Sequence, residues 1–313
     1  MDIRNLGTSG LRVSAIGLGC NNFGARIDLA ATRAVIHKAL DLGITLFDTA
    51  DVYGERGGSE TAMGEVLGEN RKRIVLATKF GMAMAEDGEH QGGSRAWIMK
   101  AVEDSLRRLR TDWIDLYQLH RPDPRTPIEE TLRALDDLIR QGKVRYVGVS
   151  NMPSWEVAGA QWTARTLGLA GFVSCQDEYS LVKRAAEAEL MPAMRAHGLG
   201  LLPYFPLASG LLTGKYRRNA PLPENARLTK TERLADRYLT ERNWQISEKL
   251  IDFAEARGHT ALELAFSWLL AQAPVASVIA GATKPEQLEQ NARAGGWALG
   301  AEELAEIDRI TAN

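Results

Sequence analysis

The sequence has little of what marks secreted, membrane-spanning or nucleic-acid-binding proteins. It contains two cysteines, Cys20 and Cys175, so no disulfide framework is predicted and a reducing cytoplasm is the simplest setting. Its longest uncharged stretch, residues 198–214, is too short for a membrane-spanning helix and is interrupted by Pro203 and Pro206. Lys and Arg total 38 and Asp and Glu total 40, so the net charge of -2 supplies no general attraction to nucleic acid or to an anionic membrane.

Two further signals are missing. The segment MDIRNLGTSGLRVS at the start carries charged residues where a signal peptide needs an apolar run, so we expect the protein to stay in the cytoplasm. The 5 histidines are scattered along the chain, with neither an HExxH motif nor paired cysteines, and no metal site is predicted.

Short apolar runs instead alternate with longer segments of helical period. A helix after every strand predicts parallel strands joined by right-handed crossovers, either in a (β/α)8 barrel or in a doubly wound sheet. The expected strands are residues 15–19, 44–48, 74–79, 114–120, 144–150, 172–178, 200–205 and 275–280. The expected helices are residues 29–42, 60–67, 95–109, 127–141, 154–167 and 187–196, two within 238–272, then 284–294 and 302–311.

The ends of these strands favour the barrel. Most strand starts recur at about 30 residues with no linker between them, and successive strands end in polar side chains that would converge on one face of a barrel. We therefore predict a single (β/α)8 TIM-barrel domain over residues 1–313, with a long loop after strand 7 and extra C-terminal helices. Residues 3–6 and 11–13 flank a Gly-Thr-Ser-Gly turn and predict a hairpin that closes the barrel bottom. The polar strand ends are Asp48, Lys79, His120, Ser150 and Gln176.

Two cofactor motifs are incomplete. Gly17 and Gly19 follow a short strand as in a dinucleotide fingerprint, but Asn22 stands where the third glycine belongs. Tyr179 and Lys183 have the Tyr-x-x-x-Lys spacing of short-chain dehydrogenases, but they follow a strand end rather than lying within a helix. Neither motif predicts a site.

Four residues on strands two to four do predict chemistry. Alone, Asp48, Tyr53, Lys79 or His120 is explained as a turn or rim residue, but the barrel brings all four together. A phenol has a pKa of about 10, and a nearby ammonium lowers it. We expect Tyr53 to act as a general acid, with Lys79 held by Asp48 to tune it and His120 orienting the substrate oxygen. Because no nucleophile or metal is present in this set, a nicotinamide would supply a hydride.

The segments FDTADVYG, ATKFG and DLYQLHRPD, which carry these residues, resemble motifs of the aldo-keto reductase family. The resemblance extends over essentially the whole chain and is strongest to the bacterial, channel-β-like branch. It implies NADP(H)-dependent reduction of aldehydes or ketones to alcohols, or the reverse reaction, with the same four residues as the catalytic set.

The resemblance also implies a dinucleotide site. NADP(H) is expected, but NAD(H) stays open because Gln287 stands where many NADP-dependent members have arginine. Lys215, Arg227 or Lys284 could compensate for that missing charge. The implied cofactor residues are Ser150, Asn151, Gln176, Tyr204, Phe205, Leu207, Ser209, Gly210, Lys215, Arg227, Gly281, Thr283, Gln287, Gln290 and Asn291.

The predicted partner is a small-molecule carbonyl compound. Phe23, Val52, Phe80 and Arg121 are the candidate substrate residues, although Phe80 and Val52 could equally be core and Arg121 a rim charge. Broad specificity is expected because only one helix and a very short tail follow Gly300, where some family members have a C-terminal lid that narrows specificity. Two alternatives stay open: a channel-β-like NADP-binding partner protein with little turnover, and a Schiff-base aldolase using Lys79. The sequence leaves monomer or homo-oligomer undecided.

Overall fold

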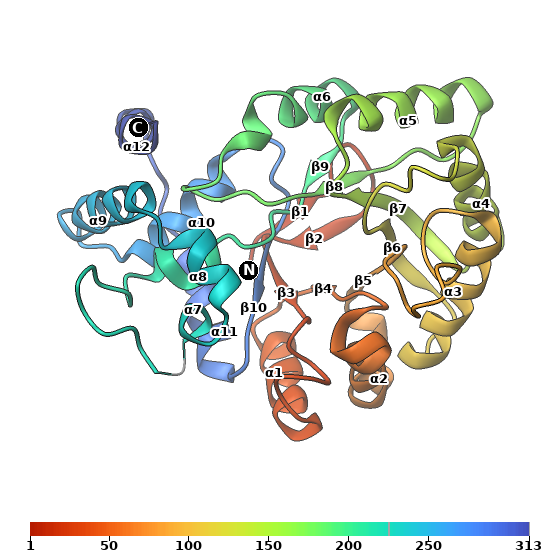
Figure 1. Cartoon of the computed structure of the whole chain (residues 1–313), viewed down its shortest axis with the longest axis horizontal. Coiled ribbons are helices and arrows are strands. Elements are labelled where there is room, and N and C mark those ends of the chain that lie inside the picture. Colours follow the sequence, from red (N-terminus) through yellow and green to blue (C-terminus); the bar gives the residue numbers. More distant parts are fainter. Residues whose placement is uncertain (225, 313) are drawn as a thin grey trace.

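The computed structural model describes residues 1–224 and 226–312, in which eight parallel strands form a barrel surrounded by helices (Figure 1). The order of the strands is β10-β3-β4-β5-β6-β7-β8-β9. Leu201 closes the barrel, because its N–H donates to the carbonyl of Pro274 at 2.6 Å and its carbonyl accepts from Ala276 at 3.0 Å. The predicted (β/α)8 barrel is confirmed. The strands are β3 (Ile16–Gly19), β4 (Leu46–Asp48), β5 (Val75–Phe80), β6 (Ile114–Leu119), β7 (Val144–Ser150), β8 (Ser174–Gln176), β9 (Gly200–Leu201) and β10 (Val278–Gly281).

Strands β8 and β9 are shorter than predicted. Pro203 and Pro206 have no N–H to donate to a neighbouring strand, so regular pairing of β9 ends at Leu201. One isolated parallel bridge, between Glu178 and Tyr204, continues the pairing beyond both strands. The N–H of Tyr204 donates to the carbonyl of Asp177 at 3.0 Å, so the chain stays bonded to its neighbour although the regular strand has ended.

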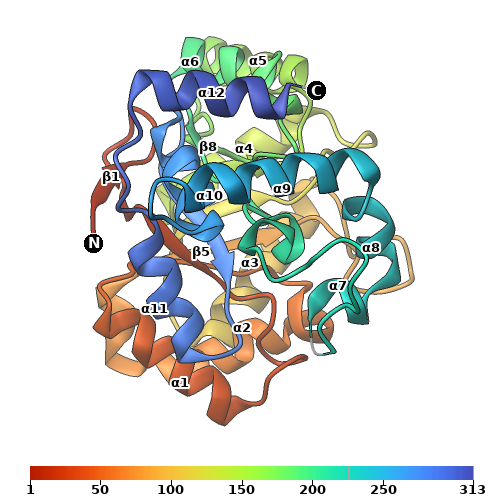
Figure 2. The same cartoon turned by 90° about the vertical axis from the view of Figure 1, so that its left-hand side faces the viewer.

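The helices form the outer layer of the barrel, and those expected from the sequence are present with small shifts of their ends. Helix α2 is assigned from Tyr53, but residues 54–57 have positive φ, so its regular part begins near the predicted start. Figure 2 shows α9 beside α12. The long helices are α1 (Leu29–Asp41), α2 (Tyr53–Leu67), α3 (Arg95–Leu109), α4 (Ile128–Arg140), α5 (Ser154–Leu167), α6 (Leu190–His197), α9 (Glu241–Glu255), α10 (Ala261–Ala271), α11 (Pro285–Ala294) and α12 (Ala301–Thr311).

Short helical segments make up much of the remaining chain. The long loop after β9 contains η3 (Ala208–Thr213), α7 (Arg227–Lys230) and α8 (Glu232–Tyr238). These helices were not predicted within the loop, because segments of four to seven residues are too short for a clear helical period. Elsewhere lie η1 (Gly68–Arg73) and η2 (Ala185–Glu187). None of the helices in the described part of the chain is long and apolar enough to span a bilayer.

The N-terminal hairpin closes one end of the barrel, as predicted. It consists of β1 (Ile3–Asn5) and β2 (Arg12–Ser14), which pair antiparallel. Leu6, Leu11 and Val13 are buried with side chains from the barrel interior in one apolar cluster. With this end of the barrel filled by apolar side chains, the cavity described below lies at the opposite, carboxyl-terminal end of the strands.

Candidate active site

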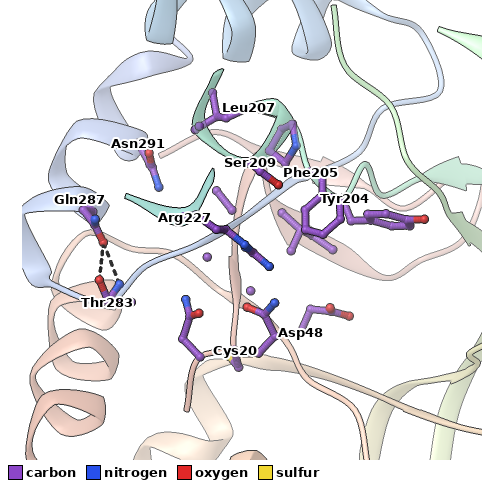
Figure 3. A pocket seen from close by; sticks show the side chains of 18 of the residues that line it. Cys20, Asp48, Tyr204, Phe205, Leu207, Ser209, Arg227, Thr283, Gln287 and Asn291 are labelled. Atoms are coloured by element: carbon purple, nitrogen blue, oxygen red, sulfur yellow. Dashed lines mark hydrogen bonds between the residues drawn. The ribbon is translucent and has the colours of Figure 1, made fainter. Parts of the chain in front are cut away.

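A cavity of about 800 Å³ opens at the carboxyl ends of the strands (Figure 3). Its walls come from the strand ends, from η3, α7 and α8 in the long loop, and from the start of α11. Asp48, Tyr53 and His120 line it, and every residue predicted for the dinucleotide lines it as well. Residues that are far apart in the sequence are thus gathered in one place.

Lys79 lies directly beneath the cavity and is fully buried. Its Nζ donates to Oδ2 of Asp48 at 2.7 Å and to the carbonyl of Thr49 at 2.9 Å. Burial by itself lowers the pKa of Lys79, but the negative charge of Asp48 and the phenol of Tyr53 raise it above its ordinary value. Lys79 is therefore a fixed ammonium group at neutral pH.

Tyr53 lies above this ammonium, whose Nζ is 5.0 Å from the centre of the phenol ring. Burial raises the pKa of Tyr53, and the charge of Lys79 opposes this rise without cancelling it. The expected lowering of the Tyr53 pKa is therefore wrong, because the cost of desolvating the phenolate outweighs its attraction to the nearby charge. The phenol holds its proton at neutral pH, which a proton donor requires.

His120 completes the group. Its ring meets the ring of Tyr53 edge-on, with centres 5.6 Å apart and planes at 84°. Burial, followed by the charges of Lys79 and Arg121, lowers the pKa of His120 to about 2. The imidazole is therefore neutral and has one N–H to donate. Its Nδ1 has no hydrogen-bond partner among the described residues.

Asp48 is held from two further directions. Its Oδ1 accepts hydrogen bonds from Nε2 of Gln176 at 2.9 Å and from Nε2 of Gln118 at 3.2 Å. Gln118 was not predicted as a site residue, although its sequence position carried a signal. It is a polar residue in a buried strand and lies two residues before His120, so both side chains face the barrel interior. Asp48 thus links a predicted cofactor residue, Gln176, to Lys79.

The side chain of Asn151 connects the ends of strands β6, β7 and β9. Its backbone has a φ of 56°, and its Nδ2 donates to Oγ of Ser150 at 2.9 Å and to the carbonyl of His120 at 3.1 Å. Its Oδ1 accepts from the hydroxyl of Tyr204 at 2.7 Å. The resemblance implies that this amide contacts the carboxamide of a nicotinamide. Such a contact requires the hydrogen bonds of Asn151 described here to be shared with the carboxamide or exchanged for bonds to it.

The η3 segment has features that fit a phosphate group. Ser209 and Gly210 have φ values of 57° and 101°, and Oγ of Ser209 is buried without a partner among the described residues. A Cβ at Gly210 would lie 3.0 Å from Nζ of Lys215, so the ammonium packs closely over this turn. A buried unpartnered hydroxyl beside a cation is the donor set that a phosphate accepts.

Two further parts of the cavity wall carry polar groups: Thr283 with Gln287 of α11, and Arg227 of α7. Thr283 donates from its N–H at 2.7 Å and from its hydroxyl at 3.2 Å to Oε1 of Gln287 (Figure 3). The guanidinium carbon of Arg227, which extends into the cavity in the same view, lies 5.0 Å from the centre of the Phe205 ring. Because Gln287 is neutral and already bonded to Thr283, Arg227 is the stronger candidate for an added phosphate charge.

The predicted substrate residues separate into two groups. Arg121 lines the cavity, whereas Phe23 and Phe80 do not and are fully buried in apolar clusters. Phe80 packs against Tyr117, with ring centres 4.6 Å apart. The structure thus places both rings in the core rather than beside a substrate, and Val52 is only partly buried but also lies outside the lining. The core position of Phe80 follows from the alternation of side chains along β5. Lys79 points into the barrel, so Phe80, the next residue, points out of it.

The fold and the arrangement of the site define a class: a (β/α)8 barrel with a buried lysine–aspartate pair, a tyrosine and a neutral histidine at the carboxyl ends of its strands. A family model described as "Aldo/keto reductase family" matches residues 15–312. The chain belongs to the aldo/keto reductase family.

Curated relatives agree with this membership. The chain is 36% identical over 327 residues to "L-glyceraldehyde 3-phosphate reductase" of Escherichia coli O157:H7, covering 100% of this chain and 93% of that protein. It is 38% identical over 320 residues to "Uncharacterized oxidoreductase YrpG" of Bacillus subtilis, covering 99% and 96%. It is 36% identical over 300 residues to "Probable voltage-gated potassium channel subunit beta" of Oryza sativa subsp. japonica, covering 94% and 91%. The family and the first two relatives support an oxidoreductase.

Proposed function

We propose that this protein is an NADP(H)-dependent oxidoreductase that reduces aldehydes or ketones to alcohols, or catalyses the reverse reaction. The observation that carries the proposal is the hydrogen-bonded pair of Lys79 and Asp48 beneath Tyr53, beside a neutral His120. The same cavity is lined by phosphate-compatible groups and is roomy enough for both a dinucleotide and a small carbonyl compound.

In the proposed reaction, NADPH would, when bound, supply the hydride for the new C–H bond. As the C=O π bond breaks, the phenol of Tyr53 gives its proton to the carbonyl oxygen, which completes the alcohol. The ammonium of Lys79 stabilises the phenolate left behind, and Asp48 holds that ammonium in place. The N–H of His120 donates to the same substrate oxygen. A proton from solvent restores Tyr53, and each step runs backward for alcohol oxidation.

The dinucleotide would be held by this chain at three places. Ser209, Gly210 and Lys215 would bind the pyrophosphate, and Tyr204 would stack on the nicotinamide ring. Arg227 would bind the 2′-phosphate and select NADPH over NADH. Both cysteines are buried and free, which suits the cytoplasmic setting that we also propose.

The first test is an assay of NADPH oxidation with a panel of aldehydes, ketones and aldoses that includes glyceraldehyde 3-phosphate. We expect turnover with several aldehydes, and an affinity for NADPH at least threefold higher than for NADH. NADH in place of NADPH is the matched control. NADPH binding with no turnover of any carbonyl compound would instead favour a channel-β-like partner protein, and affinities within threefold of each other would contradict the role of Arg227.

A Schiff-base aldolase is disfavoured by the state of Lys79. A Schiff base requires a neutral amine that the substrate can reach. The amine of Lys79 is fully buried, its pKa is raised chiefly by Asp48 against the effect of burial, and it donates to two oxygens. Its environment favours a fixed positive charge over a nucleophile.

A further inference from the structure

Arg121 occupies a distinctive position in the cavity wall. It follows His120 directly, its side chain is exposed, and it lines the cavity. Its neighbour Arg125 forms an ion pair with Asp123 at 3.6 Å, whereas no acidic side chain of the described residues lies within ion-pair distance of Arg121. Arg121 therefore adds an unneutralised positive charge to the cavity wall.

The loop beneath Arg121 is built rigidly. Oδ2 of Asp123 accepts from the N–H of Gly93 and the hydroxyl of Thr126, both at 2.8 Å, while Oδ1 accepts from the N–H of Arg125 at 3.0 Å. Prolines at positions 122 and 124 further restrict the backbone. The base of the Arg121 side chain is thus held in place while the guanidinium stays free to bind.

The charge of the whole cavity has the same sign. Asp48 is the only acidic residue in its lining among the described residues, and that carboxylate is neutralised by Lys79. Of the lining cations, Lys215 and Arg227 lie in the long loop where the dinucleotide phosphates are proposed to bind, and Arg237 is paired with Glu178. The lining cations are Arg26, Arg121, Lys215, Arg227, Arg233 and Arg237.

Arg121 acts on the reacting end of the cavity. Burial, then Lys79 and Arg121, lowers the pKa of His120, and Arg121 also opposes the rise that burial causes in the pKa of Tyr204. These are the residues proposed to meet the substrate oxygen and the nicotinamide ring. The charge of Arg121 is therefore felt where the carbonyl compound would react.

We infer that Arg121 binds an anionic group of the carbonyl substrate, a phosphate or a carboxylate, so that the site selects short anionic aldehydes over neutral ones. This inference rests on the proposed function. A guanidinium presents a planar fork of donors that matches both anions. The exposure of Arg121 at the cavity wall places it to hold the far end of a substrate whose carbonyl group lies against Tyr53 and His120.

The test compares aldehydes that differ in an anionic group: glyceraldehyde with glyceraldehyde 3-phosphate, and butanal with succinic semialdehyde. The variants are Arg121→Gln and, as the matched control on the same loop, Arg125→Gln. In Arg121→Gln we expect kcat/KM for the preferred anionic aldehyde to fall at least tenfold, mainly through KM. The kcat/KM for the neutral aldehyde of each pair should fall by a smaller factor than that for its anionic partner, NADPH affinity should change less than threefold, and Arg125→Gln should resemble the wild type.

The outcomes are distinguishable. Preference for the phosphate or for the carboxylate identifies which anion the site takes, and partial rescue by Arg121→Lys would show that charge is part of the effect. Equal losses for anionic and neutral aldehydes, or a wild type with no anion preference, would overturn the inference and leave the proposed function standing. Absence of turnover with all four aldehydes would overturn both.

Discussion

At the scale of single residues, Asp48 is the junction of the candidate site. One oxygen accepts from Lys79, and the other accepts from Gln118 and Gln176. The carboxylate therefore fixes the position of the ammonium that stabilises the Tyr53 phenolate in the proposed reaction. Because these donors come from three different strands, the position of Asp48 depends on the strand ends being correctly aligned.

Gln118→Leu tests this junction, because it keeps the approximate volume of the side chain and removes the donor. We expect kcat to fall between about ten- and hundredfold, the usual range for loss of a hydrogen bond to a charged group. Lys79 would then be placed less well and would lower the pKa of Tyr53 by a smaller amount. The pKa of Tyr53 in the variant should therefore be higher than in the wild type. Since reduction needs the protonated phenol, the alkaline limb of the kcat profile should move to higher pH.

The matched control for this variant is Gln161→Leu. Gln161 bonds the backbone of Phe172 through both of its amide atoms and lies outside the cavity lining. The Gln161→Leu variant should therefore be less stable than the wild type, with no change in the pH profile of kcat. An unchanged profile and kcat in Gln118→Leu would show that Gln118 only fills space beside Asp48.

Much at this scale could be predicted from the sequence, and the failures have physical reasons. The ends of apolar strands indicated Asp48, Lys79 and His120, because polar residues at such positions converge in a barrel. The net direction of the Tyr53 pKa shift could not be predicted, since the extent of desolvation depends on tertiary packing. The position of Phe80 could have been predicted from its alternation with Lys79.

At the scale of elements, the hairpin of β1 and β2 supports the site from the opposite end of the barrel. Leu6 is fully buried against the barrel interior, whereas Ile3 on the same hairpin is 40% exposed. We expect Leu6→Ala to lower the free energy of unfolding by about 2–4 kcal/mol, because it leaves a cavity in the barrel floor.

Urea denaturation of Leu6→Ala and, as a control, of Ile3→Ala measures this effect. Ile3→Ala, at the exposed position, should lose less than about 1 kcal/mol of the free energy of unfolding. Below the unfolding transition, kcat of Leu6→Ala should stay within twofold of the wild type, because the hairpin lies away from the cavity. A large loss of kcat in folded Leu6→Ala would show that the barrel floor and the site are coupled.

Long elements with a clear period were predictable from the sequence, and short ones were not. Helices α3 and α5 begin and end where their apolar periods predict, because one face of each packs on the barrel. Strand β9 is only two residues long, and α7 and α8 are held by tertiary contacts rather than by a repeating pattern. For example, the N–H of Leu228 in α7 donates to the hydroxyl of Tyr216 at 3.2 Å.

At the scale of the whole molecule, closure of the barrel makes the site. Asp48 and Gln176 are hydrogen-bonded across 128 positions of sequence. The cavity joins this centre to the long loop and to α11, so the proposed catalytic and dinucleotide-binding residues share one space. The regular alternation of strand and helix let the sequence predict this convergence, whereas the exclusion of Phe23 and Phe80 from the cavity wall depends on side-chain packing in three dimensions.

The most direct test of the central claim is the turnover of Tyr53→Phe, which lacks only the phenolic oxygen. We predict that kcat for aldehyde reduction falls at least a hundredfold, within the range expected for loss of a general acid. The dissociation constant for NADPH, measured by fluorescence titration on the same preparation, should stay within about twofold of the wild type. Turnover within tenfold of the wild type would contradict the assignment of Tyr53 as the proton donor.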